Sequence, residues 1–138
     1  MPPEVILALD VGEKRVGLAV ADASVPVPVA RPALLVGADL IERLLAEIDR
    51  LGITRLVVGL PRNQSGEETR QSAFCRNFGQ RLAQSTGLPL HFQDESLTSA
   101  QAEEALRQSG KPYQKGEVDS LAAQLILGDF LESWRAGR

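Results

Sequence analysis

The sequence predicts an α/β fold, in which a mixed five-stranded sheet carries helices packed on both faces. First, two apolar runs near the N-terminus flank the turn-forming residues 11–14, a pattern typical of an antiparallel hairpin. Second, beyond residue 36, apolar runs of strand length alternate with segments of helical periodicity. Third, 138 residues is close to the usual size of one domain, so we expect residues 1–138 to form a single domain.

The first two strands are predicted at residues 5–9 and 16–21. Both runs are almost wholly apolar, and the first ends in Asp10. The next stretch, residues 24–32, contains three prolines. Because proline has no backbone N–H to donate to a sheet, we interpret this stretch as a loop that leads to a third strand at residues 33–36.

Helices and strands are then expected to alternate. Apolar residues recur at helical spacing over residues 38–51, and Gly52 just beyond them is a typical helix stop. The later predicted elements are a strand at 55–60, a polar loop at 62–66, a helix around residues 74–82, a strand at 88–92, a helix at 97–107 capped by Thr98, a linker at 109–116 and a final helix over 118–130.

Composition limits the possible functions. The net charge of −3 and pI near 5.2 do not fit a protein that coats nucleic acid nonspecifically, so any such binding must be local. The one cysteine, Cys75, excludes a disulfide scaffold and a thiolate zinc site. The chain lacks both an apolar run of about 20 residues and a signal-peptide pattern, so we expect a cytoplasmic protein with no membrane segment.

Three acids stand at the ends of predicted elements and suggest chemistry. Asp10 ends the first strand, Glu95 follows the last strand, and Asp119 lies in the first turn of the last helix. Each alone has an ordinary explanation, as a turn residue, a solvated loop acid and a complement to the helix dipole respectively. If the fold brings them together, they would repel unless a hard cation such as Mg²⁺ or Mn²⁺ sits among them. Such ions can drive in-line displacement at phosphorus.

Four segments, in order, resemble the successive motifs of the YqgF/RuvX family. They are LDVGEKRVGLA at 9–19, VGLPRNQSG at 58–66, DESLT at 94–98 and VDSLAA at 118–123. Any one is weak, but four in order over nearly the whole chain are specific. The resemblance implies a ribonuclease H-like fold in the Holliday junction resolvase superfamily. It also implies an endonuclease acting on branched DNA, or alternatively one that matures the 5′ end of pre-16S rRNA in ribosome biogenesis.

The resemblance also assigns residues. Carried over by position, the catalytic and metal-binding acids are Asp10, Glu95 and Asp119. Ser96 departs from the family, which usually has arginine there, and so removes a bidentate phosphate contact for which Arg15 or Arg62 could compensate. Junction-resolving relatives imply a homodimer, since paired cuts need two sites. The residues we expect to bind nucleic acid are Lys14, Arg15, Arg62, Asn63 and Arg70.

Two other functions stay open. Ser96 and the acidic pI favour a nucleic-acid-binding module that cleaves weakly. The Asp10 hairpin also resembles a phosphate loop of actin-like ATPases, but such enzymes need a second domain to close over the nucleotide, so the length argues against one. The lone His91 is interpreted as a packed or surface residue rather than a general base.

Overall fold

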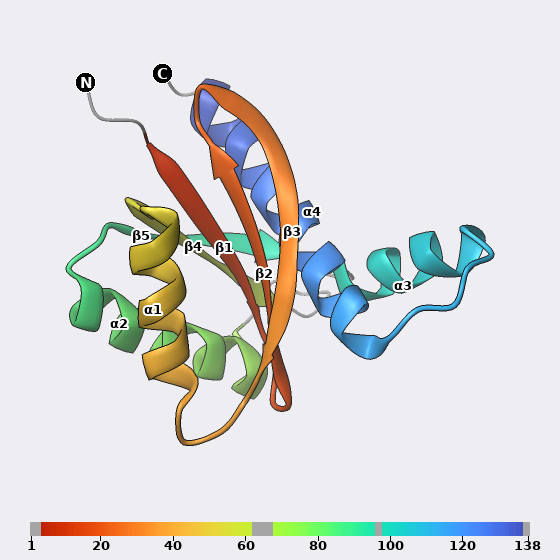
Figure 1. Cartoon of the computed structure of the whole chain (residues 1–138), viewed down its shortest axis with the longest axis horizontal. Coiled ribbons are helices and arrows are strands. Elements are labelled where there is room, and N and C mark those ends of the chain that lie inside the picture. The colour runs from red at the N-terminus through yellow and green to blue at the C-terminus, as the bar shows by residue number, and fades with distance from the viewer. Residues whose placement is uncertain (1–3, 62–67, 96–97, 137–138) are drawn as a thin grey trace.

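The fold is described by a computed structural model that covers residues 4–61, 68–95 and 98–136. In this part of the chain five strands form one sheet in the order β3-β2-β1-β4-β5, with helices on both faces (Figure 1). The predicted α/β architecture is therefore confirmed. In chain order the elements are β1 (Val5–Val11), β2 (Arg15–Asp22), β3 (Val25–Leu35), α1 (Leu40–Leu51), β4 (Arg55–Pro61), α2 (Arg70–Thr86), β5 (Leu90–Glu95), α3 (Thr98–Gln108) and α4 (Lys115–Ala136).

The centre of the sheet is the predicted hairpin. β1 and β2 pair antiparallel, with Asp10 opposite Gly17, and the N–H of Gly12 closes the turn by donating to the carbonyl of Arg15 at 3.0 Å. β4 runs parallel to β1, and β5 runs parallel to β4. Because parallel strands end at the same edge of a sheet, Asp10 and Glu95 both lie at the carboxyl edge.

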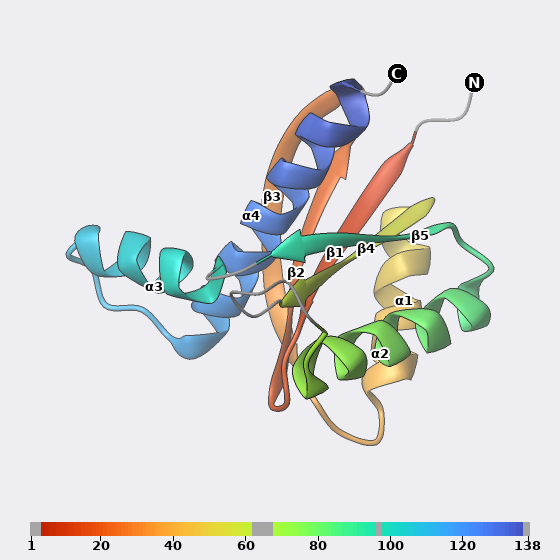
Figure 2. The same ribbon diagram turned by 180° about the vertical axis from the view of Figure 1, so that it is seen from behind.

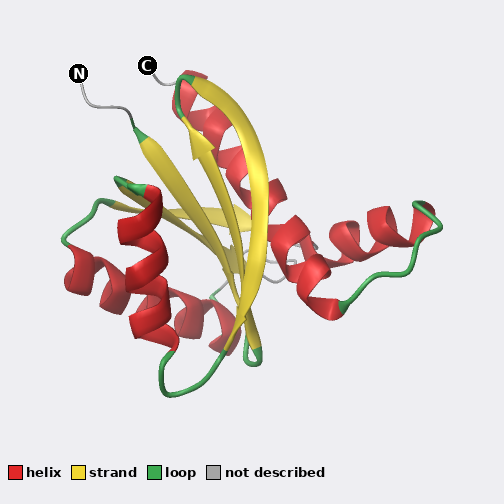
Figure 3. Ribbon diagram, viewed as in Figure 1, coloured by secondary structure: helices red, strands yellow, loops and turns green. Residues whose placement is uncertain are grey.

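The loop predicted at residues 24–32 is wrong, because these residues belong to the eleven-residue strand β3. Among the described strands it lies at the edge of the sheet and pairs only with β2 (Figure 3). Its register shifts twice, and Pro26, Pro28 and Pro32 all fall in the unpaired intervals around the shifts. An edge strand with bulges tolerates residues that donate no N–H, and this is why the prolines did not break the strand.

The outer stretch of β3 carries an apolar strip. Val25, Val27 and Val29 alternate along the strand and are each more than half exposed, at 63%, 62% and 56%. In Figure 1, α1 covers the opposite edge of this face and leaves the upper part of β3 bare. The strip therefore belongs to the surface in the monomer.

One face of the sheet is covered by α1 and α2, as Figure 2 shows from behind. Leu44, Ile48 and Leu82 pack there into the larger hydrophobic core with the side chains of Leu7 and Leu9. Gly52 ends α1 in the left-handed region at φ 67°, as the sequence predicts. Helix α2 is longer than the predicted 74–82, and Thr69 with Ser72 forms a capping box at its start.

The other face is covered by α4 (Figure 2). Ile126, Leu127 and Phe130 pack against Ile6 and Ala8 in a second core. The helix begins at Lys115, inside the predicted linker, so Asp119 lies in its second turn and not in its first. Gly116 suggested a linker, but one glycine costs a helix only about 1 kcal/mol, which the packing of α4 against the sheet outweighs.

Two glycines allow α4 to pack closely against the sheet. A Cβ at Gly17 would overlap the backbone carbonyl of Asp119, so helix and strand backbones touch at this point. A Cβ at Gly59 would lie 2.5 Å from the end of the Ile126 side chain. Helix α3 instead stands out beyond the sheet and packs on α4, in both views. None of the helices in the described ranges has the length and apolar character needed to cross a membrane.

Candidate active site

Asp10 and Asp119 come together because α4 crosses the hairpin at Gly17. Asp10 pairs with Gly17 across the two strands, and Asp119 sits directly on that glycine. The neighbours of Asp10 in the same alternation, Ile6 and Ala8, face α4, so the Asp10 side chain also points to this face. Two of the three predicted acids are therefore neighbours, although they lie far apart in the sequence.

The environment of Asp10 disfavours its charge. Burial, and after it the negative charge of Asp119, raises the pKa of Asp10 from 3.8 to about 6. A partly buried carboxylate beside a second carboxylate is a high-energy arrangement when both are charged. Strongly perturbed acids of this kind are typical of functional sites.

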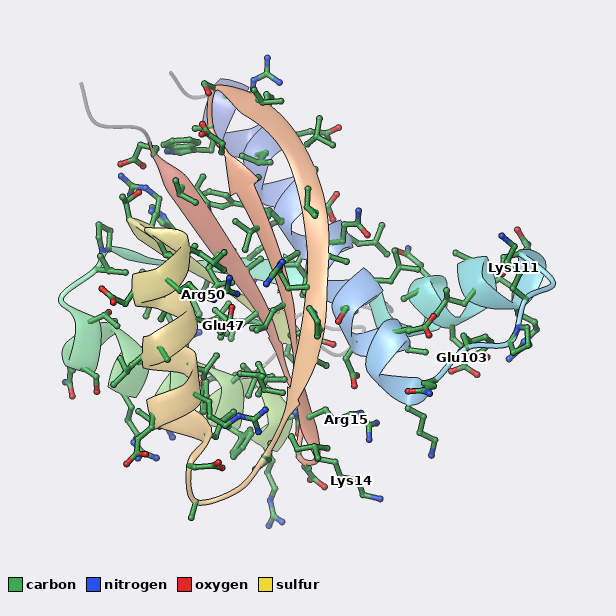
Figure 4. The ribbon with its side chains drawn as sticks, in the orientation of Figure 1. Lys14, Arg15, Glu47, Arg50, Glu103 and Lys111 are labelled. Atoms are coloured by element: carbon green, nitrogen blue, oxygen red, sulfur yellow. The ribbon has the colours of Figure 1, made fainter. Side chains whose placement is uncertain are left out.

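Asp119 is held by an arginine from the hairpin. The Nε of Arg15 donates to Oδ2 of Asp119 at 2.6 Å, and the two side chains are 26% and 20% exposed. Arg15 is the first residue of β2, immediately after the turn, and in Figure 4 it projects beside Lys14 from this end of the hairpin. We predicted Arg15 as a phosphate ligand, and the structure gives it a carboxylate partner.

Hydrogen bonds to β3 fix α4, and with it Asp119. Ser120 Oγ donates to the carbonyl of Arg31 at 2.6 Å, and Gln124 Nε2 donates to the carbonyl of Pro28 at 2.8 Å. These acceptors lie on the edge strand, and both donors were missed in the sequence because only the unexpected strand β3 supplies their partners.

Helix α2 fixes the other acid. The carbonyl of Val11, next to Asp10, accepts from Gln71 Nε2 at 3.2 Å and from the Cys75 thiol at 3.4 Å. Burial and the charge of Asp10 raise the pKa of Cys75 to about 11, so this thiol is a structural donor and a poor nucleophile.

Glu95 is the last residue of β5 and lies opposite Pro61 of β4. His91, four residues earlier on the same side of the strand, contacts Phe130 of α4, so Glu95 also belongs to the α4 face. Strand β4 separates it from Asp10, a span of two strand spacings or roughly 10 Å. Among residues 4–61, 68–95 and 98–136 no three His, Cys, Asp or Glu side chains are close enough together to bind one ion.

The residues nevertheless fit a hard divalent cation. Two neighbouring carboxylates supply the oxygen donors that Mg²⁺ and Mn²⁺ prefer, and a bound cation would favour the charged form of Asp10, which burial and the charge of Asp119 disfavour. A third acid stands at the same edge and on the same face. The ligand set Asp10, Glu95 and Asp119 stays a prediction.

A groove of about 710 Å³ lies between β3, α3 and α4, and its lining includes Arg15 and Ser120, the residue after Asp119. Arg15 lines one end, and β3, α3 and α4 form the walls through residues that include Pro32, Leu106 and Leu121. Of the other predicted nucleic-acid ligands, Lys14 is exposed on the hairpin turn and Arg70 is exposed at the start of α2. Arg62, Asn63, the loop at 62–66 and Ser96 lie outside the described residues.

His91 is a packed residue, as predicted. Its ring lies 5.0 Å from that of Phe130, and its Nε2 is 2.8 Å from Arg55 Nη1. Burial and the charge of Arg55 lower the pKa of His91, which favours the neutral ring.

The family model described as "RuvX: Holliday junction resolvase" matches residues 4–133. A protein of Chloroflexus aurantiacus named "Putative pre-16S rRNA nuclease" is 40% identical over 142 residues, which cover 99% of this chain and 92% of that protein. One of the same name from Lactococcus lactis is 37% identical over 134 residues, covering 93% and 94%.

Solved structures share the fold. The Thermus thermophilus RuvC in complex with a Holliday junction substrate superposes with a TM-score of 0.58 at 16% identity, and the alignment covers 96% of both chains. The fowlpox virus Holliday junction resolvase gives a TM-score of 0.55 at 13% identity, covering 94% of this chain and 99% of that one. The fold is thus ribonuclease H-like, of the resolvase type.

Proposed function

The chain belongs to the RuvX family, and from this premise we propose that it is a metal-dependent endonuclease that hydrolyses phosphodiester bonds in the cytoplasm. Its substrate would be branched DNA or precursor rRNA. Asp10, Glu95 and Asp119 would be its catalytic acids.

The observation that carries this proposal is the partly buried Asp10 beside Asp119. A fold does not keep two neighbouring carboxylates, one of them with a pKa near 6, for stability alone, because the burial of Asp10 and, after it, the charge of Asp119 make the ionised form of Asp10 costly. Glu95 lies at the same carboxyl edge of the sheet as Asp10, and Arg15, the partner of Asp119, lines the groove between β3, α3 and α4. Carboxylates that can hold a metal ion, an arginine that can contact a phosphate and a groove for the strand are the elements that phosphodiester cleavage requires.

The three acids would hold Mg²⁺ or Mn²⁺. When bound, the metal would supply an activated water and stabilise the charge that develops during in-line displacement. Asp10 contributes from a rigid position, because its strand is paired on both sides and its neighbour Val11 is fixed by α2. Lys14, Arg15, Arg62, Asn63 and Arg70 would contact phosphates and so orient the strand without reading its sequence.

Two substrates have support from the comparisons. The matching family model is described as a Holliday junction resolvase, and the curated relatives carry the name of a pre-16S rRNA nuclease. We expect the purified protein with Mg²⁺ or Mn²⁺ to cut one of four substrates selectively: a four-way DNA junction, linear duplex, single strand, or precursor rRNA. Absence of cleavage on all four, under conditions where the protein still binds the junction or the rRNA, would favour a binding module instead.

We also propose a homodimer. Symmetric cuts across a junction need two active sites related by a two-fold axis, and the described chain carries the elements of one. Light scattering should give a mass near twice the 14.9 kDa of the chain, at least with junction DNA bound. A strictly monomeric protein that still cuts would point to rRNA.

A further inference from the structure

The ion pair between Arg15 and Asp119 joins a cation of this chain to a proposed metal ligand. Oδ2 of Asp119 accepts a hydrogen bond from Arg15 Nε at 2.6 Å, and only 26% of the arginine side chain is exposed. Such a pair is partly shielded from solvent and holds more strongly than an exposed one. The guanidinium thereby supplies, without metal, the positive charge that two adjacent carboxylates need.

We propose that Arg15 is the resident counter-ion of Asp119 in the metal-free protein and must leave this carboxylate before a divalent cation is bound there. The inference rests on the proposed function, since it concerns the same metal site. Electrostatic repulsion favours exchange over coexistence. A divalent ion binds carboxylate oxygens at about 2.0 to 2.2 Å, which would place it within a few ångströms of the guanidinium and cause strong repulsion.

The position of Arg15 makes the exchange possible. It is the first residue of β2, directly after an exposed turn, and its side chain also lines the groove between β3, α3 and α4. A guanidinium released from Asp119 would remain at the mouth of this groove, where a substrate phosphate would pass. Arg15 is thus a positioning residue with two alternative partners, the Asp119 carboxylate without metal and a phosphate with metal.

The exchange predicts that removing Arg15 makes metal binding tighter. We would titrate Mn²⁺ calorimetrically into the purified chain without nucleic acid, and compare Arg15→Gln with Lys14→Gln as a matched control. Lys14→Gln removes the same charge one residue earlier, on the exposed turn. Arg15→Gln should bind Mn²⁺ roughly tenfold tighter or more, because a charge-assisted hydrogen bond no longer competes. Lys14→Gln should change the affinity less than about twofold.

Thermal unfolding gives a second readout. In chelator Arg15→Gln should melt below the unaltered protein, since Asp119 has lost its counter-ion, and saturating Mn²⁺ should raise its melting temperature by more. Should Arg15→Gln fail to fold, Arg15→Lys keeps the charge but loses the planar fork and should show a smaller tightening.

The outcomes separate the two proposals. If the unaltered protein binds Mn²⁺ and Arg15→Gln binds it equally or more weakly than Lys14→Gln, Arg15 supports the site instead of competing for it, and the inference is wrong. If neither the unaltered protein nor any variant binds Mn²⁺, the proposed metal site itself is wrong, and the inference is wrong with it.

Discussion

Replacing Asp10 with asparagine is expected to abolish cleavage, with a loss of at least about 10³-fold, and at the same time to stabilise the metal-free protein. Loss of a metal ligand removes several kcal/mol of transition-state stabilisation, and each 1.36 kcal/mol is about tenfold in rate. Asparagine keeps the shape of the side chain but removes the charge that repels Asp119. Activity and stability should therefore change in opposite directions.

The gain in stability should depend on pH. The pKa of Asp10 is raised from 3.8 to about 6 in the folded protein, so its protonated form favours folding. That contribution is fully present below pH 3.8 and is lost as the pH rises through about 6. At pH 8 in chelator, Asp10→Asn should raise the free energy of unfolding by up to about 3 kcal/mol, and near pH 4 by almost nothing. Urea unfolding at the two pH values measures the difference.

Asp22→Asn is the control for this experiment. Asp22 is an exposed acid in the same hairpin, and its carboxylate accepts from Ser24. This variant should cut at the normal rate and should keep the rise in melting temperature that Mn²⁺ gives the unaltered protein, while Asp10→Asn should lose that rise. Normal cleavage by Asp10→Asn, or marked destabilisation of Asp10→Asn in chelator, would show that Asp10 is structural.

Replacing Gly17 with alanine is expected to destabilise the protein by about 3 kcal/mol and to eliminate cleavage. The new methyl group would overlap the Asp119 backbone carbonyl, and neither the strand backbone nor the helix backbone yields easily. Helix α4 would have to move away from β2, which would also separate Asp119 from Asp10. Denaturant unfolding and the cleavage assay check both effects.

Gly59→Ala is the matched control. It adds the same methyl group under the same helix, but there it meets the flexible end of the Ile126 side chain. Since a side chain can change its rotamer, we expect a smaller cost, about 1 kcal/mol, and retained cleavage. If Gly17→Ala were as stable and as active as Gly59→Ala, close contact of α4 with β2 would not be what places Asp119.

Local patterns predicted the elements whose determinants are local. The hairpin follows from two apolar runs around a glycine turn, and α1 follows from its periodicity and Gly52, so both were predicted nearly to the residue. Strand β3 was missed because its residues became a strand only through pairing with β2 and through bulges that accommodate the prolines. A single sequence does not display either condition.

The site shows the same division. The edge shared by Asp10 and Glu95 could be predicted, since acids that follow parallel strands lie at one edge. The pairing of Asp119 with Arg15 could not, because it depends on where α4 crosses the hairpin. The signal for that crossing was Gly17, a glycine inside an otherwise apolar strand, which often marks close approach of another backbone.

The prolines of β3 also matter for the solubility of the protein. Val25, Val27 and Val29 form a row of exposed β-branched side chains on an edge strand, a combination that promotes stacking of sheets from different molecules into aggregates. A growing aggregate needs a continuous ladder of backbone donors along the edge. Pro26, Pro28 and Pro32 interrupt this ladder with residues that donate no N–H, and the bulges twist the edge away from a flat template. The three prolines that made this segment resemble a loop in the sequence thus protect concentrated protein from self-association through this edge.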